Sequence, residues 1–156
     1  MPDKATGKLP IALRLGNQIK QCEQVLIAEK SRILREFDLT VPQYAALLVL
    51  SETPKISGAR LARGCGVTAQ AVTGLVNLLD ERGLISRTRS DVHAKVLIID
   101  LTRSGRALLR RADEAAIVVE QRLLDAYTDE QLTAFRGYLE TMRAALSSET
   151  AKRVQV

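Results

Sequence analysis

The sequence has little of the chemistry on which most enzymes and metal sites depend. Only one of its 156 residues is histidine and two are cysteine. Cys22 and Cys65 lie far apart without a ligand pattern around them, which predicts free thiols in a reducing compartment. Gly64 and Gly66 lack the third glycine and the preceding strand of a phosphate-binding loop. With no Ser/His/Asp or Cys/His constellation either, we expect no enzyme and no bound metal or cofactor.

Long apolar runs are also absent. The longest, residues 44–50, is far too short to span a bilayer, and residues 1–8 contain no hydrophobic region typical of a secretion signal. We therefore expect a cytoplasmic protein without a membrane partner. The hydrophobic content of 46% is nevertheless enough for a packed core in one domain, with or without an appended oligomerisation segment.

The positive charge is concentrated in one third of the chain. The net charge of the whole chain is +5, and the segment between Lys55 and Arg103 holds eight basic and four acidic residues, a net charge of +4. A basic segment of this kind favours a polyanionic partner.

The same segment has the pattern of a winged helix-turn-helix. Ser57 can cap a short helix, Gly66 suits the positive φ of a turn, and Thr68 can cap a second helix that ends before Gly83. Alternating segments then follow on both sides of a short polar stretch at residues 91–94, which predicts a β-hairpin. A short helix, a turn, a second helix and a basic hairpin, in this order, indicate a DNA-binding module.

The residues expected to contact DNA lie on the second helix and the hairpin. Gln70 and Asn77 share an outward stripe with Thr73, and their amides suit adenine, whereas Thr73 can meet a thymine methyl group. Arginines at or near the hairpin tip can enter a minor groove. The candidate DNA-binding residues are Ser57, Arg60, Arg63, Thr68, Ala69, Gln70, Thr73, Asn77, Arg87, Arg89, His93 and Lys95. The alternative is a winged helix that serves only as a protein-interaction module, which would need neither the polar helix face nor the basic hairpin.

Amphipathic helices flank this module on both sides. Apolar residues recur at helical spacing from about Pro10 to Phe37, and a mostly buried helix is expected over residues 41–52, capped by Thr40. Beyond caps at Thr102 and Thr128, apolar positions alternate in steps of three and four, a seam that favours a symmetric homodimer. The expected fold class is mainly α with a small β-hairpin wing (α+β). The expected segments are a dimerisation helix (1–38), the winged helix-turn-helix (39–102), C-terminal dimerisation helices (103–148) and a flexible tail (149–156).

The chain resembles the MarR family of bacterial transcription regulators. The resemblance is carried by residues 39–44, by Leu61 and Ala62, by residues 72–87 and by residues 101–105. It implies a homodimer in which helices from both chain ends interlock, a palindromic double-stranded DNA operator, and a repressor that a small ligand or thiol oxidation releases.

The resemblance also has departures. Gly74 and Leu78 stand where the family usually has Arg or Lys, and the usual Asp-x-Arg of the wing reads Asp91-Val-His93. Binding is therefore expected either to depend more than usual on the hairpin and on Arg60 and Arg63, or to be weak.

Two kinds of trigger could release the DNA. One class of the family senses peroxide through a cysteine in the first helix, where Cys22 lies; because Cys22 falls on the apolar stripe, we expect a buried core thiol, with redox sensing as the alternative. The other trigger is a small anionic or aromatic effector. Two adjoining helices would line its pocket with Arg14, Gln18, Tyr44 and Leu48.

Overall fold

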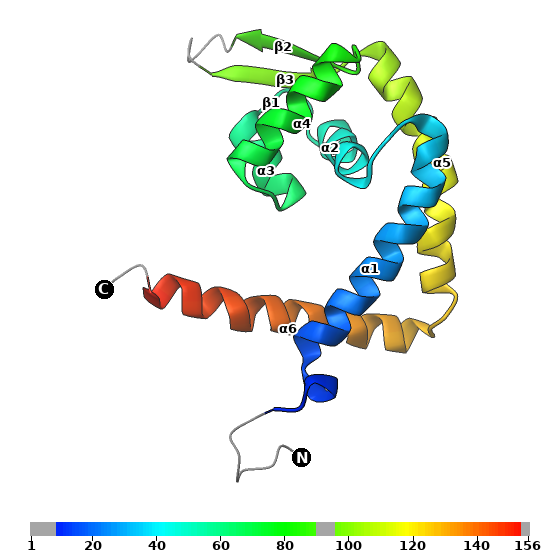
Figure 1. Cartoon of the computed structure of the whole chain (residues 1–156), viewed down its shortest axis with the longest axis vertical. Coiled ribbons are helices and arrows are strands. Elements are labelled where there is room, and N and C mark those ends of the chain that lie inside the picture. Colours follow the sequence, from blue (N-terminus) through cyan, green and yellow to red (C-terminus); the bar gives the residue numbers. More distant parts are fainter. Residues whose placement is uncertain (1–8, 90–95, 154–156) are drawn as a thin grey trace. The chain divides into compact units, whose positions relative to one another are not determined.

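The computed structural model describes residues 9–89 and 96–153, with side chains up to residue 147. The chain forms two compact units, Met1–Ile117 and Val118–Val156. Helices dominate both units, and the first also holds a small three-stranded sheet (Figure 1). This confirms the predicted fold class.

The N-terminal segment is helical, but its ends differ from the prediction. A 3-10 turn, η1 (Ile11–Leu13), precedes helix α1 (Leu15–Leu34), and a second 3-10 turn, η2 (Arg35–Phe37), follows it. The predicted α-helix from Pro10 to Phe37 is therefore too long at both ends. Asp38 ends the segment because it has a φ of 52°, a left-handed conformation that no helix can continue.

Three capped helices follow in the first unit: α2 (Val41–Glu52), α3 (Gly58–Cys65) and α4 (Ala69–Glu81). The side chains of Thr40, Ser57 and Thr68 each accept a hydrogen bond from the backbone N–H three residues later, as the sequence predicts. Gly66 ends α3 with a φ of 67°, which a residue without Cβ adopts at no steric cost.

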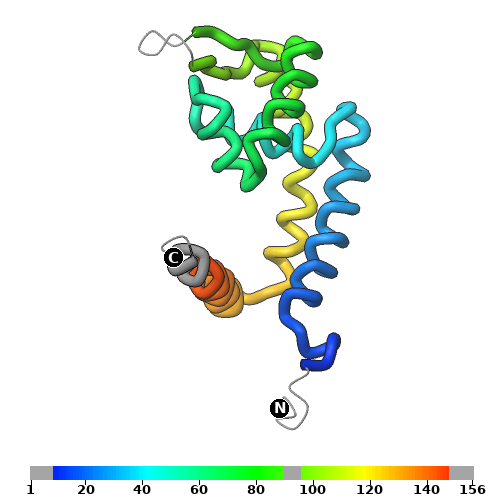
Figure 2. The backbone as a smooth tube through the Cα atoms, turned by 60° about the vertical axis from the view of Figure 1, so that its left-hand side comes forward, coloured from blue at the N-terminus to red at the C-terminus, as the bar shows by residue number. Residues whose placement is uncertain are grey.

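The sheet is antiparallel, with strand order β1-β3-β2. Strands β2 (Ile85–Arg89) and β3 (Leu97–Leu101) form the predicted hairpin, and β1 (Ile56–Ser57) pairs with the other edge of β3. Figure 2 shows the hairpin projecting from the helices of the module, while α1 leads away from it as one long helix. Ile85, Ile99 and Leu101 point into the core, so the strands bury one face.

The core of the first unit lies between these helices and the sheet. Its fully buried large side chains come from α1, α2, α3 and α4: Leu34, Leu47, Leu50, Leu61 and Leu79. Helix α5 (Arg103–Leu124) adds Leu109, Ala112 and Ala116 to the same cluster. Tyr44 is buried in it as well, and its hydroxyl donates a hydrogen bond to Asp113 of α5.

The start of α5 is bonded directly to the turn after α4. The hydroxyls of Thr102 and Ser104 donate to the carbonyl of Gly83 at 2.7 and 2.8 Å, and the backbone N–H of Thr102 donates to the carbonyl of Leu84 at 3.1 Å. The predicted cap is present, because Thr102 also accepts from the N–H of Gly105 at 3.0 Å. These bonds join the helix-turn-helix to the helix that continues into the second unit.

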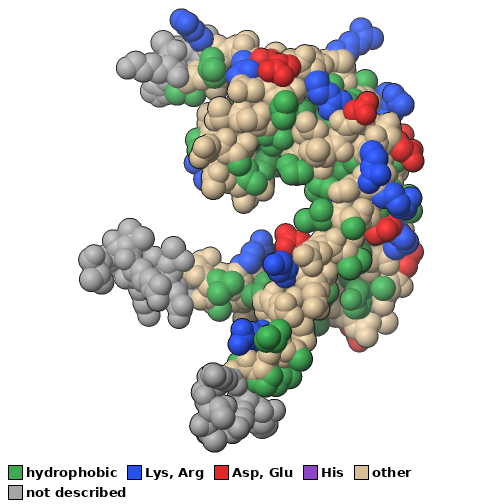
Figure 3. All heavy atoms as spheres, in the orientation of Figure 1, with side chains coloured by type: hydrophobic (Ala, Val, Ile, Leu, Met, Phe, Trp, Pro, Cys, Tyr) green, Lys and Arg blue, Asp and Glu red, His purple; other side chains and the backbone are tan. Residues whose placement is uncertain are grey.

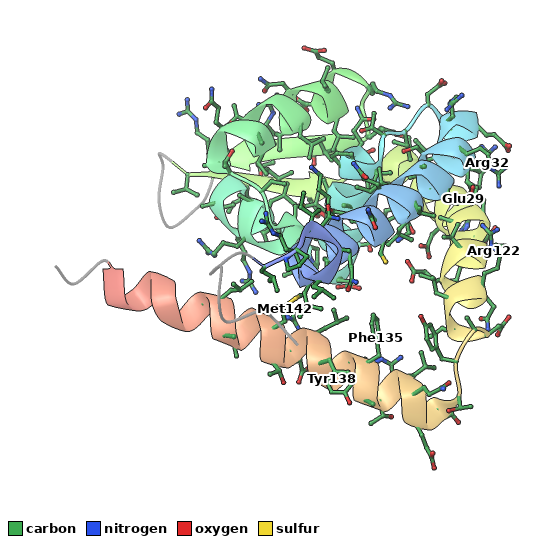
Figure 4. The ribbon with its side chains drawn as sticks, turned by 60° about the horizontal axis from the view of Figure 1, so that its bottom comes forward. Glu29, Arg32, Arg122, Phe135, Tyr138 and Met142 are labelled. Carbon is green, nitrogen blue, oxygen red and sulfur yellow. The ribbon has the colours of Figure 1, made fainter. Side chains whose placement is uncertain are left out.

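The second unit contains the end of α5 and helix α6 (Asp129–Arg153). Thr128 caps α6 as predicted, in a reciprocal pair of hydrogen bonds with Gln131 at 2.9 and 3.3 Å. Tyr127 and Phe135 stack with their ring centroids 6.0 Å apart. Figure 4 shows the side chains along α6, including Phe135, Tyr138 and Met142.

Much of the apolar surface of the long helices is exposed. On α1 the exposed large side chains include Leu15 and Val25, and on α6 they include Tyr138 and Leu146, each at least 67% exposed. Cys22 of α1 is exposed too, so the expected buried core thiol is wrong for the single chain. Among the residues of α1, only Leu34, at the end of the helix, is buried in the core of the first unit. In the described part of the chain, no helix is long and apolar enough to cross a membrane.

The contact between Gly105 and Leu84 gives a stability prediction. A Cβ atom added at Gly105 would lie 1.9 Å from the carbonyl oxygen of Leu84, whereas one added at Gly74 on α4 would meet nothing within 4 Å. We expect Gly105→Ala to lower the free energy of unfolding by at least about 2 kcal/mol, because a backbone atom must move. The control Gly74→Ala should raise it by about 1 kcal/mol through helix propensity. Urea unfolding followed by circular dichroism measures both, and equal values for the two variants would contradict the contact.

Candidate nucleic-acid interface

Helix α4 presents the polar stripe that the sequence predicts. Ala69, Gln70, Thr73 and Asn77 are all exposed. Thr68 caps the helix, its hydroxyl accepting from the N–H of Ala71 at 3.2 Å. The stripe begins at this capped end, where free backbone N–H groups favour a phosphate.

Not every member of the stripe has free polar atoms. The hydroxyl of Thr73 donates to the carbonyl of Ala69 at 3.0 Å, and the amide oxygen of Asn77 accepts from Nη1 of Arg87 at 2.9 Å. Among the predicted readers on α4, only Gln70 thus has a long polar side chain without a recorded intramolecular partner within the described residues.

Arg87 is not at the tip of the hairpin, contrary to the prediction. It pairs with Ile99 in the middle of the β2–β3 ladder. Its guanidinium donates from Nε to Oδ2 of Asp80 at 2.9 Å, and its Nη2 lies 2.7 Å from the same oxygen. Arg87 therefore joins the wing to α4. Sequence reasoning missed this pairing, because Asp80 lies on α4 and Arg87 on β2, and no local period relates residues of two different elements.

Arg89 occupies the position that was expected of a wing arginine. It is exposed, it is the last residue of β2, and it pairs with Leu97. The other two predicted wing residues, His93 and Lys95, lie outside the described residues. Figure 3 shows acidic side chains beside basic ones at the top of the visible face.

Arg60 and Arg63 are exposed on α3, as predicted. Both border a hollow of about 340 Å³ together with Val49, Thr53, Ile56 and Gly64. No acidic partner of either arginine is recorded in the part of the chain that the structure describes. By contrast, Asp100 neutralises Arg106 at 3.0 Å. Arg60 and Arg63 of α3 and Arg89 of β2 are thus exposed cations without a recorded acidic partner among the described residues. Ser57 is half-buried and serves α3 as its cap, accepting from the N–H of Arg60 at 3.4 Å.

A second hollow, of about 420 Å³, lies between α3, α4 and the hairpin, and sequence reasoning missed it. It is lined by Ser57, Gly58, Ala59, Val72, Thr73, Val76, Arg87, Val96, Leu97 and Ile99. These residues come from five elements, β1, α3, α4, β2 and β3, and from Val96 before β3, so no local pattern could have grouped them.

Cys65 stands at the end of α3 and is half-buried against the core, where a small buried hydrophobe was expected. Burial raises the pKa of its thiol, which makes the reactive thiolate rarer at neutral pH. Cys65 is therefore a packing residue of the turn.

The predicted effector pocket is not assembled within one chain. Arg14 and Gln18 lie at the start of α1, where they donate to the backbone carbonyls of Leu9 and Ala12. Tyr44 and Leu48 lie on α2, which contacts the other end of α1. The two ends of this 20-residue helix are roughly 30 Å apart, because an α-helix rises about 1.5 Å per residue. The prediction grouped the four residues because α1 and α2 adjoin. The two helices do meet, but at the end of α1 and not at its start, where Arg14 and Gln18 lie.

Comparison with known proteins gives the same family repeatedly. A family model described as MarR family matches residues 37–95. The HTH-type transcriptional repressor Rv2887 of Mycobacterium tuberculosis is 34% identical over 128 residues, which cover 82% of this chain and 92% of that protein.

Two solved structures are similar to this chain in fold as well as in sequence. The Rv2887 protein of M. tuberculosis, a MarR family protein in complex with p-aminosalicylic acid, is 33% identical with a TM-score of 0.64 and covers 83% of this chain and 98% of that one. The transcriptional repressor CouR, bound to a 23-mer DNA duplex, is 26% identical with a TM-score of 0.78 over 88% of this chain and 99% of that one.

The cap of α4 gives a prediction for the interface. Thr68→Ala removes the acceptor for the N–H of Ala71 and should lower the free energy of unfolding by about 1 kcal/mol. Thr68→Ser keeps the hydroxyl and should stay close to wild type. Chemical unfolding of the three proteins measures the difference, and an unchanged stability of Thr68→Ala would show that the cap contributes nothing.

Proposed function

The chain belongs to the MarR family, and we propose that it is a transcriptional repressor that binds a palindromic operator as a homodimer and is released by a small-molecule effector. The observation that carries this proposal is the exposed polar stripe of α4, in a module where Arg60 and Arg63 of α3 and Arg89 of β2 have no recorded acidic partner within the described residues. Helix α4 has the width and polarity to enter a major groove. The arginines supply the phosphate and minor-groove contacts that orient it.

The exposed apolar residues of the long helices support the homodimer. Side chains such as Leu15, Val25 and Leu146 are too large and too numerous to remain in water, and a second copy would cover them. We assign dimerisation to residues 1–38 and 103–148 and DNA binding to residues 39–102. A two-fold dimer would place its two α4 helices in grooves about 34 Å apart or a multiple of that distance.

The effector that we propose is a small aromatic carboxylate. The relative Rv2887 was solved in complex with p-aminosalicylic acid and with salicylic acid, at 33% and 32% identity to this chain. A ligand of this class combines an apolar ring with one anionic group, which matches the anionic or aromatic effector expected from the sequence. Exposure of Cys22 keeps thiol oxidation as the second candidate trigger.

Salt dependence tests DNA binding. Duplexes selected from a random-sequence pool should bind wild type with an affinity that falls steeply with salt. Arg89→Ala should reduce the slope of log affinity against log salt by about 0.9 per protomer, because one phosphate contact is lost from each. The control Arg32→Ala removes the same charge from α1 and should leave the slope unchanged. If wild type binds no duplex at low salt, the chain is a protein-interaction module instead.

Release of DNA tests the effector. Salicylate at millimolar concentration should lower the affinity for the selected duplex at least tenfold, while benzyl alcohol, which has the ring but no carboxylate, should not. Fluorescence anisotropy at constant ionic strength measures both. If peroxide releases the DNA from wild type but not from Cys22→Ser, and salicylate has no effect, thiol oxidation is the trigger.

A further inference from the structure

Three side chains form a polar network between the wing and helix α4. Arg87 of β2 donates to Asp80 from Nε at 2.9 Å, and its Nη1 donates to Oδ1 of Asn77 at 2.9 Å. Asp80 and Asn77 lie three residues apart on α4, so one guanidinium spans nearly a full turn of the helix. The network is the only recorded polar side-chain link between the hairpin and α4 in the described residues.

The network fixes which way the amide of Asn77 faces. A guanidinium carries five N–H donors and no acceptor, so it can face only the oxygen of an amide and never its NH₂ group. The oxygen of Asn77 is therefore turned toward Arg87, which leaves the NH₂ group of this exposed residue available to another partner. Asn77 therefore offers a hydrogen-bond donor, its NH₂ group, to a partner.

The arginine is held firmly enough to impose this orientation. Its side chain is 28% exposed and that of Asp80 is 37% exposed, so water competes only partly for the ion pair. Two nitrogens of Arg87 contact one carboxylate oxygen at 2.9 and 2.7 Å, which fixes the plane of the guanidinium as a single contact would not. Because the plane of the guanidinium is fixed, the direction of Nη1 is fixed as well, and Nη1 points toward Asn77.

We propose that Arg87 is a positioning residue for base recognition: held by Asp80, it orients Asn77 so that the NH₂ group faces the major groove and selects a base with an acceptor edge. Guanine, with O6 and N7, and thymine, with O4, present only acceptors at this edge. Adenine presents N7 beside the N6 donor, and the amide oxygen that would accept from N6 is turned toward Arg87. This deepens the proposed function, on which it rests. It replaces the adenine contact that the sequence suggested for Asn77, and it removes Arg87 from the wing residues that were predicted to contact DNA directly.

Base preference and salt dependence together test this proposal. Duplexes are selected from a random-sequence pool with wild type, and each base pair of the recovered site is then varied singly. Asn77→Ala identifies the position that Asn77 reads, where wild type should prefer guanine or thymine. Arg87→Ala should weaken the preference at that same position about tenfold, and the double variant should be no worse than either single one.

The salt slope separates positioning from direct contact. If Arg87 acts through Asn77, Arg87→Ala should leave the slope of log affinity against log salt as in wild type, in contrast to Arg89→Ala. Arg87→Lys keeps the charge but cannot contact Asp80 and Asn77 together, so it should lose the base preference as well. Asp80→Asn, which keeps the size of the side chain and leaves Arg87 in place, should weaken the preference too. Circular dichroism and size-exclusion chromatography check that each variant is folded and keeps its oligomeric state.

The outcomes are distinct. A slope that falls by about 0.9 per protomer in Arg87→Ala, a preference that survives Arg87→Lys, or adenine at the position read by Asn77 would each overturn this proposal while leaving DNA binding intact. If wild type binds no duplex at all, the proposed function fails with it.

Discussion

The close approach of Gly105 to the carbonyl of Leu84 is the contact on which the arrangement of the DNA-binding module depends. At this point the turn after α4, the end of the hairpin and the start of α5 meet, and the hydroxyls of Thr102 and Ser104 satisfy the carbonyl of Gly83. Only a residue without a side chain allows α5 to begin so near the backbone of another segment. The start of α5 is thus connected to the turn that follows α4 by the hydrogen bonds of Thr102 and Ser104 and by the contact of Gly105 with Leu84.

The charges of the module act in two groups. Arg87 and Arg106 are paired with Asp80 and Asp100 and hold the structure together, whereas Arg60, Arg63 and Arg89 have no recorded acidic partner in the described residues. A net positive charge counted along the sequence does not distinguish these groups. The distinction matters because a paired arginine contributes little to the attraction of a polyanion, although it can fix the side chains that read it.

The exposed apolar helices constrain the protein in another way. Large apolar residues along α1 and α6 remain in contact with water in the single chain. A second copy of the chain would bury them, and a two-fold dimer would at once fix the distance between two α4 helices. The apolar surface that is exposed in the single chain would then form the dimer interface. The two-fold symmetry of that dimer would match the symmetry of a palindromic DNA site.

The sequence by itself determined the elements and their order. The caps at Thr40, Ser57, Thr68, Thr102 and Thr128, the turn at Gly66 and the hairpin pattern depend on neighbours within a few residues, and the structure has all of them. Tertiary structure decided which side chains are free to act. Arg87 lies against Asp80 and Asn77, Arg14 lies far from Tyr44, and Cys22 is exposed, because these outcomes depend on how distant segments pack. Local periodicity carries no information on such packing, so the position of a charge in the sequence could not reveal its partner.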